Sequence, residues 1–439
     1  LMRGAVHSYL EYAIDYASAG MYEEATQLLS FVAEGNEATY PMVYYALGYF
    51  ASKMGKKDEA LNLYKKAETM CPDYCFPNKL EEVLMLNDAM SLNPEGAKAP
   101  YYLGNFHYAA RIYDEAIACW EKSASIDDTY PTVLRNLSLA YYNKQHNPQK
   151  ALATLEKAYN LDTTDARILM ELDQLYKKLR YPHRQRLDFL EAHADVVEQR
   201  DDLCIERITL YNQLGEYQKA YDLINSRKFH PWEGGEGKVT SQYLLCRVEL
   251  AKIAIREGRF ADAVRLLKET EKYPDNLGEG KLSMAEENDI HYWMGCAYEG
   301  LGEEALAKEY FTKATKGSAE PAIAFFYNDQ QPDKIFYQGL AWRKLGEEDK
   351  ARSRFNRLIK HGEKHLFDKV KIDYFAVSLP DLLIWDDDLN VRNQIHCNLV
   401  MGMGYLGLGD KEQARKFLSE VARLDINHQA GKQLLEMCG

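Results

Sequence analysis

The chain has 439 residues, and its shares of hydrophobic (46%) and charged (28%) residues are those of a soluble folded protein. The formal net charge is −13, and no basic stripe runs along the chain. Binding to nucleic acid depends on neutralising phosphates, so we expect no nucleic-acid partner. No apolar run is long enough to span a bilayer, so we expect no membrane partner either.

The eight cysteines are spread widely. Only Cys71 and Cys75 lie close together, and no CxxC pair occurs, which argues against a zinc ribbon or a thioredoxin-like site. We interpret the cysteines as small core residues in a reducing compartment. The expected location is cytoplasmic. The start of the sequence resembles that of a fragment, which leaves an upstream signal peptide open.

Small residues recur along the chain at intervals that predict paired helices. The recurring position is held by alanines: Ala25, Ala60, Ala116, Ala220, Ala263, Ala307, Ala351 and Ala414. The first clear unit contains Tyr44, Leu47-Gly48, Gly55, Ala60, Tyr64, Ala67 and Pro72. Later units repeat this order around Leu103-Gly104 with Trp120, Met294-Gly295 with Phe311, and Met401-Gly402 with Leu418. The period is about 34 residues, allowing for insertions.

Each position in this pattern has a physical role. The small residue of the first helix, such as Gly48 or Gly104, lets the second helix approach closely, and an alanine does the same from the other side. Aromatic residues such as Tyr64 and Trp120 fill the space between neighbouring helix pairs. A glycine such as Gly55 ends the first helix in a left-handed conformation.

This pattern resembles the tetratricopeptide repeat family, with about ten units, some of them degenerate. The resemblance implies an all-α fold, a right-handed α-solenoid of helix-turn-helix repeats. We expect an N-terminal array over residues 1–200, with a lone extra helix near 79–93, and a C-terminal array over 201–439. Long inserted loops are expected at 225–240, 273–290 and 363–392.

Two of these loops share the sequence Gly-Glu-Gly-Lys, ending at Lys238 and Lys281, about one repeat apart. Insertions at the same position of successive repeats emerge on the same face of a solenoid, so the two loops should lie side by side. They form a candidate ligand or docking site, and the alternative is that they only close the ends of long helices. The candidate residues are His230, Trp232, Glu233, Glu236, Lys238, Asn276, Glu279, Lys281 and His291.

The loop sequences and the segment 371–388 are also similar to a family of large bacterial proteins of unknown function. In that family a tetratricopeptide array follows an N-terminal β-sandwich domain similar to mutarotase-like folds. This resemblance implies that the loops face such a domain, or complete a carbohydrate pocket with it. It supplies no catalytic residue.

No motif in the sequence predicts chemistry. Lys238 and Lys281 are followed by Val239 and Leu282, so neither loop completes a phosphate-binding motif. Asp386-Asp387-Asp388 lacks the calcium-loop pattern and is better explained as an acidic helix start. We expect no cofactor, no metal site and no enzyme activity. Two of the loop carboxylates brought together would suit glycoside chemistry, although surface acids explain them more simply.

The first helices line the concave face of a tetratricopeptide array, and this face is the second candidate site. The predicted partner-binding residues are Tyr45, Tyr49, Tyr101, Asn105, Asn136 and Arg167. Aromatic side chains supply contact area, and asparagines bond an extended backbone. The last three match a clamp that some family members use for a carboxylate, but Tyr101 and Glu171 depart from it. The alternative is that the tyrosines pack on neighbouring helices.

The sequence therefore predicts a scaffold that binds a protein or peptide segment, or the N-terminal β-sandwich domain of its own protein. A different class of function is the helical half of a carbohydrate-active protein that contributes loops to a sugar site. A third hypothesis is a homo-oligomer that pairs through its C-terminal unit.

Overall fold

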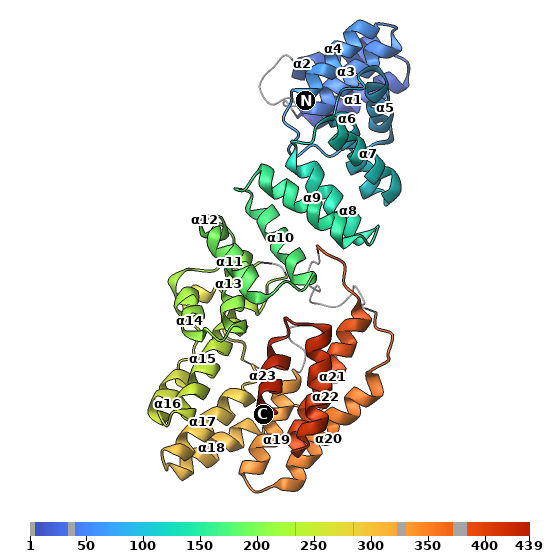
Figure 1. Cartoon of the computed structure of the whole chain (residues 1–439). Helices are drawn as coiled ribbons and strands as arrows, with labels where there is room; N and C mark the ends of the chain where they lie inside the picture. Colours follow the sequence, from blue (N-terminus) through green and yellow to red (C-terminus); the bar gives the residue numbers. More distant parts are fainter. Residues whose placement is uncertain (1–4, 34–39, 233, 284, 323–330, 372–383) are drawn as a thin grey trace. The chain divides into compact units, whose positions relative to one another are not determined.

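A computed structural model describes residues 5–33, 40–232, 234–283, 285–322, 331–371 and 384–439. Every regular element in these ranges is a helix, and helices adjacent in the sequence pack as pairs, such as Pro41–Lys53 with Lys57–Glu68 and Asn288–Gly300 with Glu304–Ala314, which confirms the predicted all-α fold of helix pairs (Figure 1). No described helix is long and apolar enough to cross a membrane. The chain divides into two compact units, Leu1–Ile168 and Leu169–Gly439. The division that we expected at residue 200 falls between α12 and α13, inside the second unit.

Unit 1 consists of helix pairs and one additional helix. Its helices are α1 (Val6–Ser18), α2 (Tyr22–Ala33), α3 (Pro41–Lys53), α4 (Lys57–Glu68), α5 (Leu80–Leu92), α6 (Lys98–Ala109), α7 (Tyr113–Ile126), α8 (Pro131–Asn143) and α9 (Pro148–Leu161). Helix α5 lies where the sequence suggests a lone helix, and it packs between α3 and α6. The boundary between the units falls in the first turn of α10 (Ala166–Lys178).

Unit 2 continues the same arrangement. After α10 its helices are α11 (His183–Ala192), α12 (Ala194–Val197), α13 (Asp201–Gln213), α14 (Tyr217–Ser226), α15 (Lys238–Arg256), α16 (Phe260–Lys268), η1 (Asp275–Leu277), α17 (Asn288–Gly300), α18 (Glu304–Ala314), α19 (Pro332–Lys344), α20 (Glu348–His365), α21 (Leu389–Leu408), α22 (Lys411–Leu424) and α23 (Gln429–Met437). The first helices of successive pairs, α13, α15, α17, α19 and α21, pack on one another. We call the face that they form the inner face of unit 2.

Close approach at glycine positions explains why the helices pair. A Cβ atom on Gly48 would lie 2.4 Å from the ring of Tyr64, and one on Gly104 would lie 2.4 Å from the ring of Trp120. In unit 2, a Cβ on Gly295 would lie 2.6 Å from Phe311. In these three pairs the aromatic ring of the second helix rests on the bare backbone of the first. The predicted close approach at the glycines is confirmed, but the rings pack within a pair, where we expected them between neighbouring pairs.

The recurring alanines complete this packing. The eight alanines of the alignment are all buried, with side chains no more than 4% exposed. The turn glycines Gly55, Gly215, Gly258, Gly302, Gly346 and Gly409 have φ between 75° and 86°. The predicted left-handed termination of the first helices is thus confirmed.

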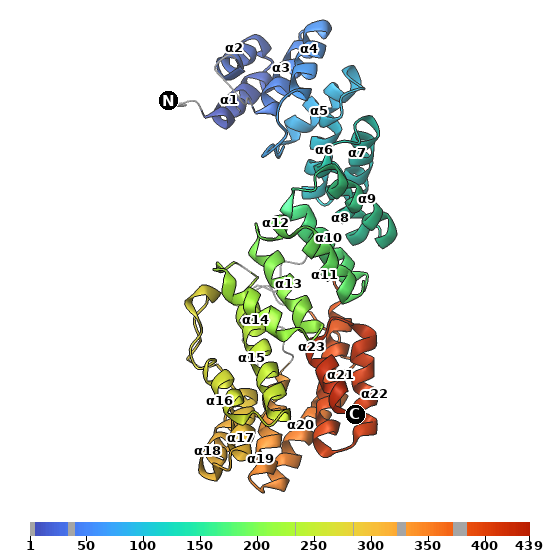
Figure 2. The ribbon, with the colours of Figure 1, turned by 60° about the vertical axis from the view of Figure 1, so that its left-hand side comes forward.

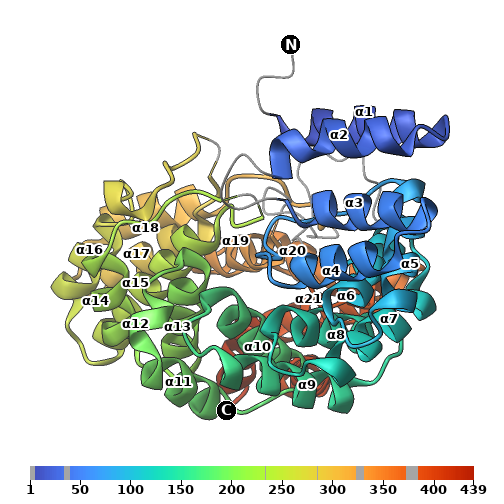
Figure 3. The same cartoon turned by 90° about the horizontal axis from the view of Figure 1, so that it is seen from above.

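The end of unit 2 returns to its beginning. The turn between α22 and α23 contacts α10, α11 and α13, the first residue of α23 contacts α15, and the two regions lie beside each other in the ribbon (Figures 2 and 3). Trp385, just before α21, is 1% exposed, and its indole N–H donates to the carbonyl of Glu171 on α10 at 3.1 Å. Lys178 of α10 pairs with Asp387 at 3.0 Å. Unit 2 is therefore a curved array closed by contacts between its first and last repeats.

Candidate functional site

The predicted partner-binding residues of unit 1 divide into buried and accessible side chains. Tyr45 is fully buried, and its hydroxyl donates to Glu68 at 2.8 Å. Tyr101 is 5% exposed and packs against the rings of Tyr102 and Tyr130. These two tyrosines hold the helices of unit 1 together, which is the packing role that we considered as the alternative.

The other predicted residues of unit 1 keep accessible surface. Tyr49 is partly exposed, with the Lys53 ammonium 5.0 Å from its ring centre. Asn105 accepts hydrogen bonds from the Trp120 indole at 3.1 Å and from the Asn136 amide at 3.3 Å, which connects α6, α7 and α8. Arg167 is exposed at the start of α10. These four residues, Tyr49, Asn105, Asn136 and Arg167, are called the unit 1 face below.

The two inserted loops lie side by side, as their shared sequence predicts. The Glu279 carboxylate accepts the N–H of Gly237 at 3.0 and 3.1 Å. Asn276 donates its side-chain amide to the carbonyls of Ile224 and Arg227 at 2.8 and 2.9 Å, and its own carbonyl accepts the N–H of Phe229. Glu279 and Asn276 therefore bind the loops to each other.

The remaining loop candidates differ in exposure. His230 is 74% exposed and bonds Asp201, while Glu236 and Lys238 are also exposed. Trp232 lies against Gly235, where an added Cβ would be 2.0 Å from the indole. Lys281 pairs with Glu287 at 2.5 Å.

Three loop candidates, Glu233, Glu279 and His291, bear on the proposed sugar chemistry or on acid–base behaviour. Glu233 lies outside the described residues. Burial raises the pKa of Glu279, and the nearby Glu236 raises it further, against the lowering effect of the Gly237 N–H. Burial lowers the pKa of His291. Among the described residues, no group of three or more His, Cys, Asp or Glu side chains is arranged to hold a metal ion.

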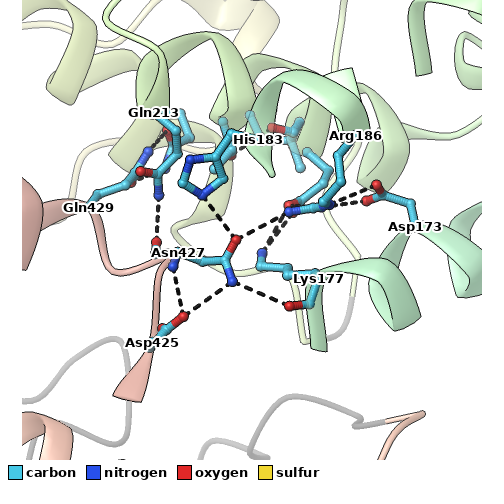
Figure 4. Close-up of polar contacts among 12 residues, drawn as sticks. Asp173, Lys177, His183, Arg186, Gln213, Asp425, Asn427 and Gln429 are labelled. Carbon is cyan, nitrogen blue, oxygen red and sulfur yellow. Dashed lines mark hydrogen bonds and ion pairs between the residues drawn. The ribbon is translucent and has the colours of Figure 1, made fainter. Parts of the chain in front are cut away.

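A site that the sequence analysis missed lies where unit 2 closes. Asn427, in the turn between α22 and α23, makes polar contacts in several directions (Figure 4). Its side-chain oxygen accepts from Arg186 at 3.3 Å and from the Nε2–H of His183 at 3.2 Å. Its side-chain nitrogen donates to the carbonyl of Lys177 at 3.4 Å, and its own carbonyl accepts from Gln213 at 2.5 Å.

Neighbouring residues extend this contact. Gln242 on α15 and Gln429 exchange two amide hydrogen bonds, at 3.0 and 3.1 Å. The Lys432 ammonium donates to the carbonyl of Gln213 at 2.6 Å. We call the residues that contact the Asn427 turn and the start of α23 the turn seat. Lys177 contributes its backbone carbonyl, and His183, Arg186, Gln213 and Gln242 contribute their side chains. The turn seat thus binds a polypeptide turn through both backbone and side-chain amides.

A buried ion network supports the turn seat. Arg186 is 1% exposed and forms a bidentate pair with Asp173 at 2.7 and 3.0 Å. It also donates to Glu206 at 2.7 Å, and Lys177 donates to the same carboxylate at 2.9 Å. Burial opposes ionisation of Glu206, but Lys177 and Arg186 outweigh it and lower its pKa to about 2. Arg186 is therefore held in place while one of its N–H groups reaches Asn427.

The repeat pattern contains a signal for Asn427 that could have been used. The turns after α7 and α9 carry Asp127-Asp128-Thr129 and Asp162-Thr163-Thr164, and each threonine bonds only the aspartate of its own turn. Asp425-Ile426-Asn427 occupies the corresponding place after α22, and Asp425 accepts the N–H of Asn427 at 2.8 Å. The change from threonine to asparagine adds an amide that reaches beyond its own turn.

Comparison with known proteins agrees with the repeat pattern. Residues 43–74 and 289–316 match one model described as Tetratricopeptide repeat, and residues 335–361 match another with the same description. Among solved structures, PilF of Pseudomonas aeruginosa is 19% identical over 51% of this chain and 90% of its own, with a TM-score of 0.30. YrrB, described as a TPR protein with an unusual peptide-binding site, is 16% identical over 50% of this chain and 95% of its own, with a TM-score of 0.29.

A third similar structure, Naa15/Naa10 bound to HypK-THB, is 10% identical over 99% of this chain and 66% of its own, with a TM-score of 0.35. Scores this low carry no implication for what the chain binds. The matched models lie in both units, at α3–α4, α17–α18 and α19–α20. The chain therefore contains tetratricopeptide repeats in each of its two units.

Proposed function

We propose that this chain is a protein-interaction scaffold that binds an extended segment of a partner protein on the first helices of its repeats. The supporting observation is the turn seat, where α10, α11, α13 and α15 already bind a backbone carbonyl and amide side chains of the Asn427 turn and the start of α23. The first helices of other repeats can bind a second polypeptide through the same kinds of hydrogen bond.

The unit 1 face is the proposed docking surface for that segment. Tyr49 offers a rigid aromatic side chain, and the amides of Asn105 and Asn136 lie where an extended backbone can exchange hydrogen bonds with them. Arg167 adds an exposed cation at the start of α10. An interface of this kind owes most of its affinity to a few such anchors.

The test is affinity capture from a lysate of the source cells with the full chain immobilised, followed by binding measurements on the captured protein. Tyr49→Ala and Asn136→Ala should each weaken binding about tenfold or more, the loss typical of an interface anchor. The matched control is Tyr12→Ala, which removes a tyrosine that is 54% exposed on α1. Equal binding by wild type and both unit 1 variants would exclude the unit 1 face.

A second candidate function is docking of a neighbouring domain, such as an N-terminal β-sandwich, on the inserted loops. It is supported by the hydrogen bonds of Glu279 and Asn276, which hold the two loops together. His230, Glu236 and Lys238 are exposed on these loops. Docking on a preformed surface avoids the entropy cost of ordering loops. Glu236→Lys should weaken association with the separately expressed domain, and unchanged association would contradict this candidate.

A further inference from the structure

Two consecutive repeats of unit 2 present the same pair of side chains on their first helices. Asp289 is the second residue of α17, and Asp333 is the second residue of α19. Four residues after each aspartate comes an aromatic residue, Trp293 or Tyr337. Because α17 and α19 pack directly on each other, the two pairs are neighbours on the inner face.

Two sets of contacts join these side chains and Lys334 across α17 and α19. The Trp293 indole N–H donates to the Tyr337 hydroxyl at 3.2 Å. The Lys334 ammonium lies 2.5 Å from a carboxylate oxygen of Asp289 and 3.2 Å from one of Asp333. Asp333 is the most accessible of the three charged groups, with 33% of its side chain exposed against 17% for Lys334.

The charges in this group do not balance. Two carboxylates share the single ammonium of Lys334, while the adjacent Glu249 and Lys252 neutralise each other at 2.6 Å. Burial raises the pKa of Asp333. The neighbouring Asp289 raises it further, and Lys334 lowers it. A carboxylate that is partly desolvated and only partly paired gains free energy when a second cation binds it.

The surrounding residues reinforce the negative potential. The hydroxyl of Tyr273, in the second inserted loop, has its pKa raised to about 12 by burial and by Glu287, Asp289 and Glu279, against the opposing charge of Lys334. The inner face next to Asp333 therefore favours a positive charge, and the Trp293–Tyr337 pair supplies apolar surface beside it.

We propose that Asp289, Asp333, Trp293 and Tyr337 form a docking site for a lysine or arginine side chain of a partner segment. The cation would bind the Asp333 carboxylate, and its methylene stem would pack against the aromatic pair. This inference rests on the proposed scaffold function and specifies the partner chemistry on the inner face of unit 2. The five residues that create it, Lys334 included, are called the acidic–aromatic site.

The experiment is selection of random displayed peptides on the immobilised full chain, followed by fluorescence anisotropy with the best binder. Selected peptides should be enriched in lysine or arginine at one position. Replacing that residue by glutamine should weaken binding to wild type about tenfold, the loss expected for one charge-assisted hydrogen bond. Asp333→Asn should weaken the original peptide equally and abolish the difference between the two peptides.

Asp262→Asn is the matched control, because Asp262 is an exposed carboxylate on α16 that pairs with Arg259. It should leave both affinities unchanged, and circular dichroism should show that both variants remain helical. If peptides are selected but lack a basic residue coupled to Asp333, the acidic–aromatic site is wrong and the scaffold function stands. If the wild-type chain selects no peptide, or binds a neutral glycan through these residues instead, both the scaffold function and this inference are overturned.

Discussion

The two units contain the same repeat but stabilise it differently. In unit 1, interior contacts include rings on glycine backbone and tyrosine clusters such as Tyr45, Tyr64 and Tyr102. In unit 2, the same ring-on-glycine packing persists, but most of the buried polar and charged side chains among the described residues are found there as well. Closure of unit 2 accounts for part of this difference, because the buried Arg186, Gln213 and Gln242 bond the Asn427 turn and the start of α23.

The comparison teaches that a repeat array can use its inner face in two ways. Unit 2 binds its own Asn427 turn and the start of α23 at the turn seat, to which the inner face contributes Gln213 of α13 and Gln242 of α15. The acidic–aromatic site occupies a different part of the same face, on α17 and α19. Substitutions of buried charged residues should therefore lower the stability of unit 2. Substitutions of the glycines that contact aromatic rings should lower the stability of unit 1 as strongly as that of unit 2.

The largest effect is expected from Arg186→Ala. This change leaves the buried Asp173 and the partly buried Glu206 without their shared cation, and breaking such a network costs about 3–5 kcal/mol. Hydrogen exchange of the full chain should show loss of protection in α10, α11 and α13, with α3 unchanged. Arg184→Ala is the control, because Arg184 is half exposed and pairs with Glu216 at the surface. Equal loss of protection in α3 would show that the two units do not respond separately.

Gly48→Ala should have the next largest effect, in unit 1. The added Cβ would lie 2.4 Å from the Tyr64 ring, and overpacking of this kind costs about 1–3 kcal/mol. Exchange of α3 and α4 amides should report the loss, while Gly280→Ala, with no atom within 4 Å of the added Cβ, should leave stability unchanged. No loss of protection in α3 would contradict the role assigned to the ring-on-glycine contact.

Asn427→Ala tests the closure of unit 2 directly. It removes the side-chain bonds to Lys177, His183 and Arg186 and should cost about 1–2 kcal/mol, mostly as local opening of α22 and α23. Thr164→Ala is the matched control, since Thr164 holds the same turn position but bonds only Asp162. The closure is not maintained by Asn427 if both variants lose equal protection.

The contacts that close unit 2 should also weaken at acidic pH, with a smaller loss of stability than that expected for Asn427→Ala. Burial lowers the pKa of His183, whose Nε2–H donates to Asn427, and Arg186, Lys177 and Lys432 lower it further. The stabilisation is therefore complete above the unfolded pKa of about 6.5 and is lost as the pH falls through the lower folded value. His428, next to Asp425, has its pKa lowered by burial and acts in the same direction.

The protection factor of amides at the Asn427 turn, which is the intrinsic exchange rate at each pH divided by the observed rate, should thus fall between about pH 7 and pH 5, while the protection factors of α3 in unit 1 stay constant. His183→Gln keeps a donor without a titrating ring and should reduce this fall. An identical fall in this variant would assign the pH response to other groups.

The smallest expected effect is a gain in unit 1. Arg111 follows α6 at the place where Gly55 follows α3, and it has a left-handed φ of 63°. Because glycine adopts this conformation without a Cβ clash, Arg111→Gly should stabilise unit 1 by about 0.5–1 kcal/mol, measured by chemical denaturation. The reverse change, Gly55→Arg, should destabilise it by a similar amount.

The repeat itself could be predicted from sequence because it depends on short-range spacing. The contact of Gly48 with Tyr64 joins residues that are neighbours in one helix pair, so composition and period reveal it. The two inserted loops occupy the same position in successive repeats, so the sequence predicts that they are adjacent. The hydrogen bond from the Gly237 N–H to the Glu279 carboxylate confirms this. The start of α21 was also predicted correctly, since Asp388 caps that helix by accepting the N–H of Asn390.

The closure could not be predicted, because it depends on curvature summed over many repeats. No local pattern tells that Asn427 meets Arg186, which lies more than half the chain away, or that Trp385 meets Glu171. The burial of Tyr45 and Tyr101 also depends on tyrosines outside their own helical turns, Tyr64, Tyr102 and Tyr130, which pack against their rings. Asp289 and Asp333 could have been found, since the repeat alignment places them at one position.

The Asn427 contact has a consequence for how the protein can change over generations. Duplication or loss of a helix pair is a common event in open repeat arrays, because each repeat contacts only its neighbours. In unit 2 such an event would move Asn427 by a whole repeat away from His183 and Arg186 and leave both ends without partners. The copy number of unit 2 is therefore constrained by its geometry, and any evolutionary lengthening of the chain should occur outside it.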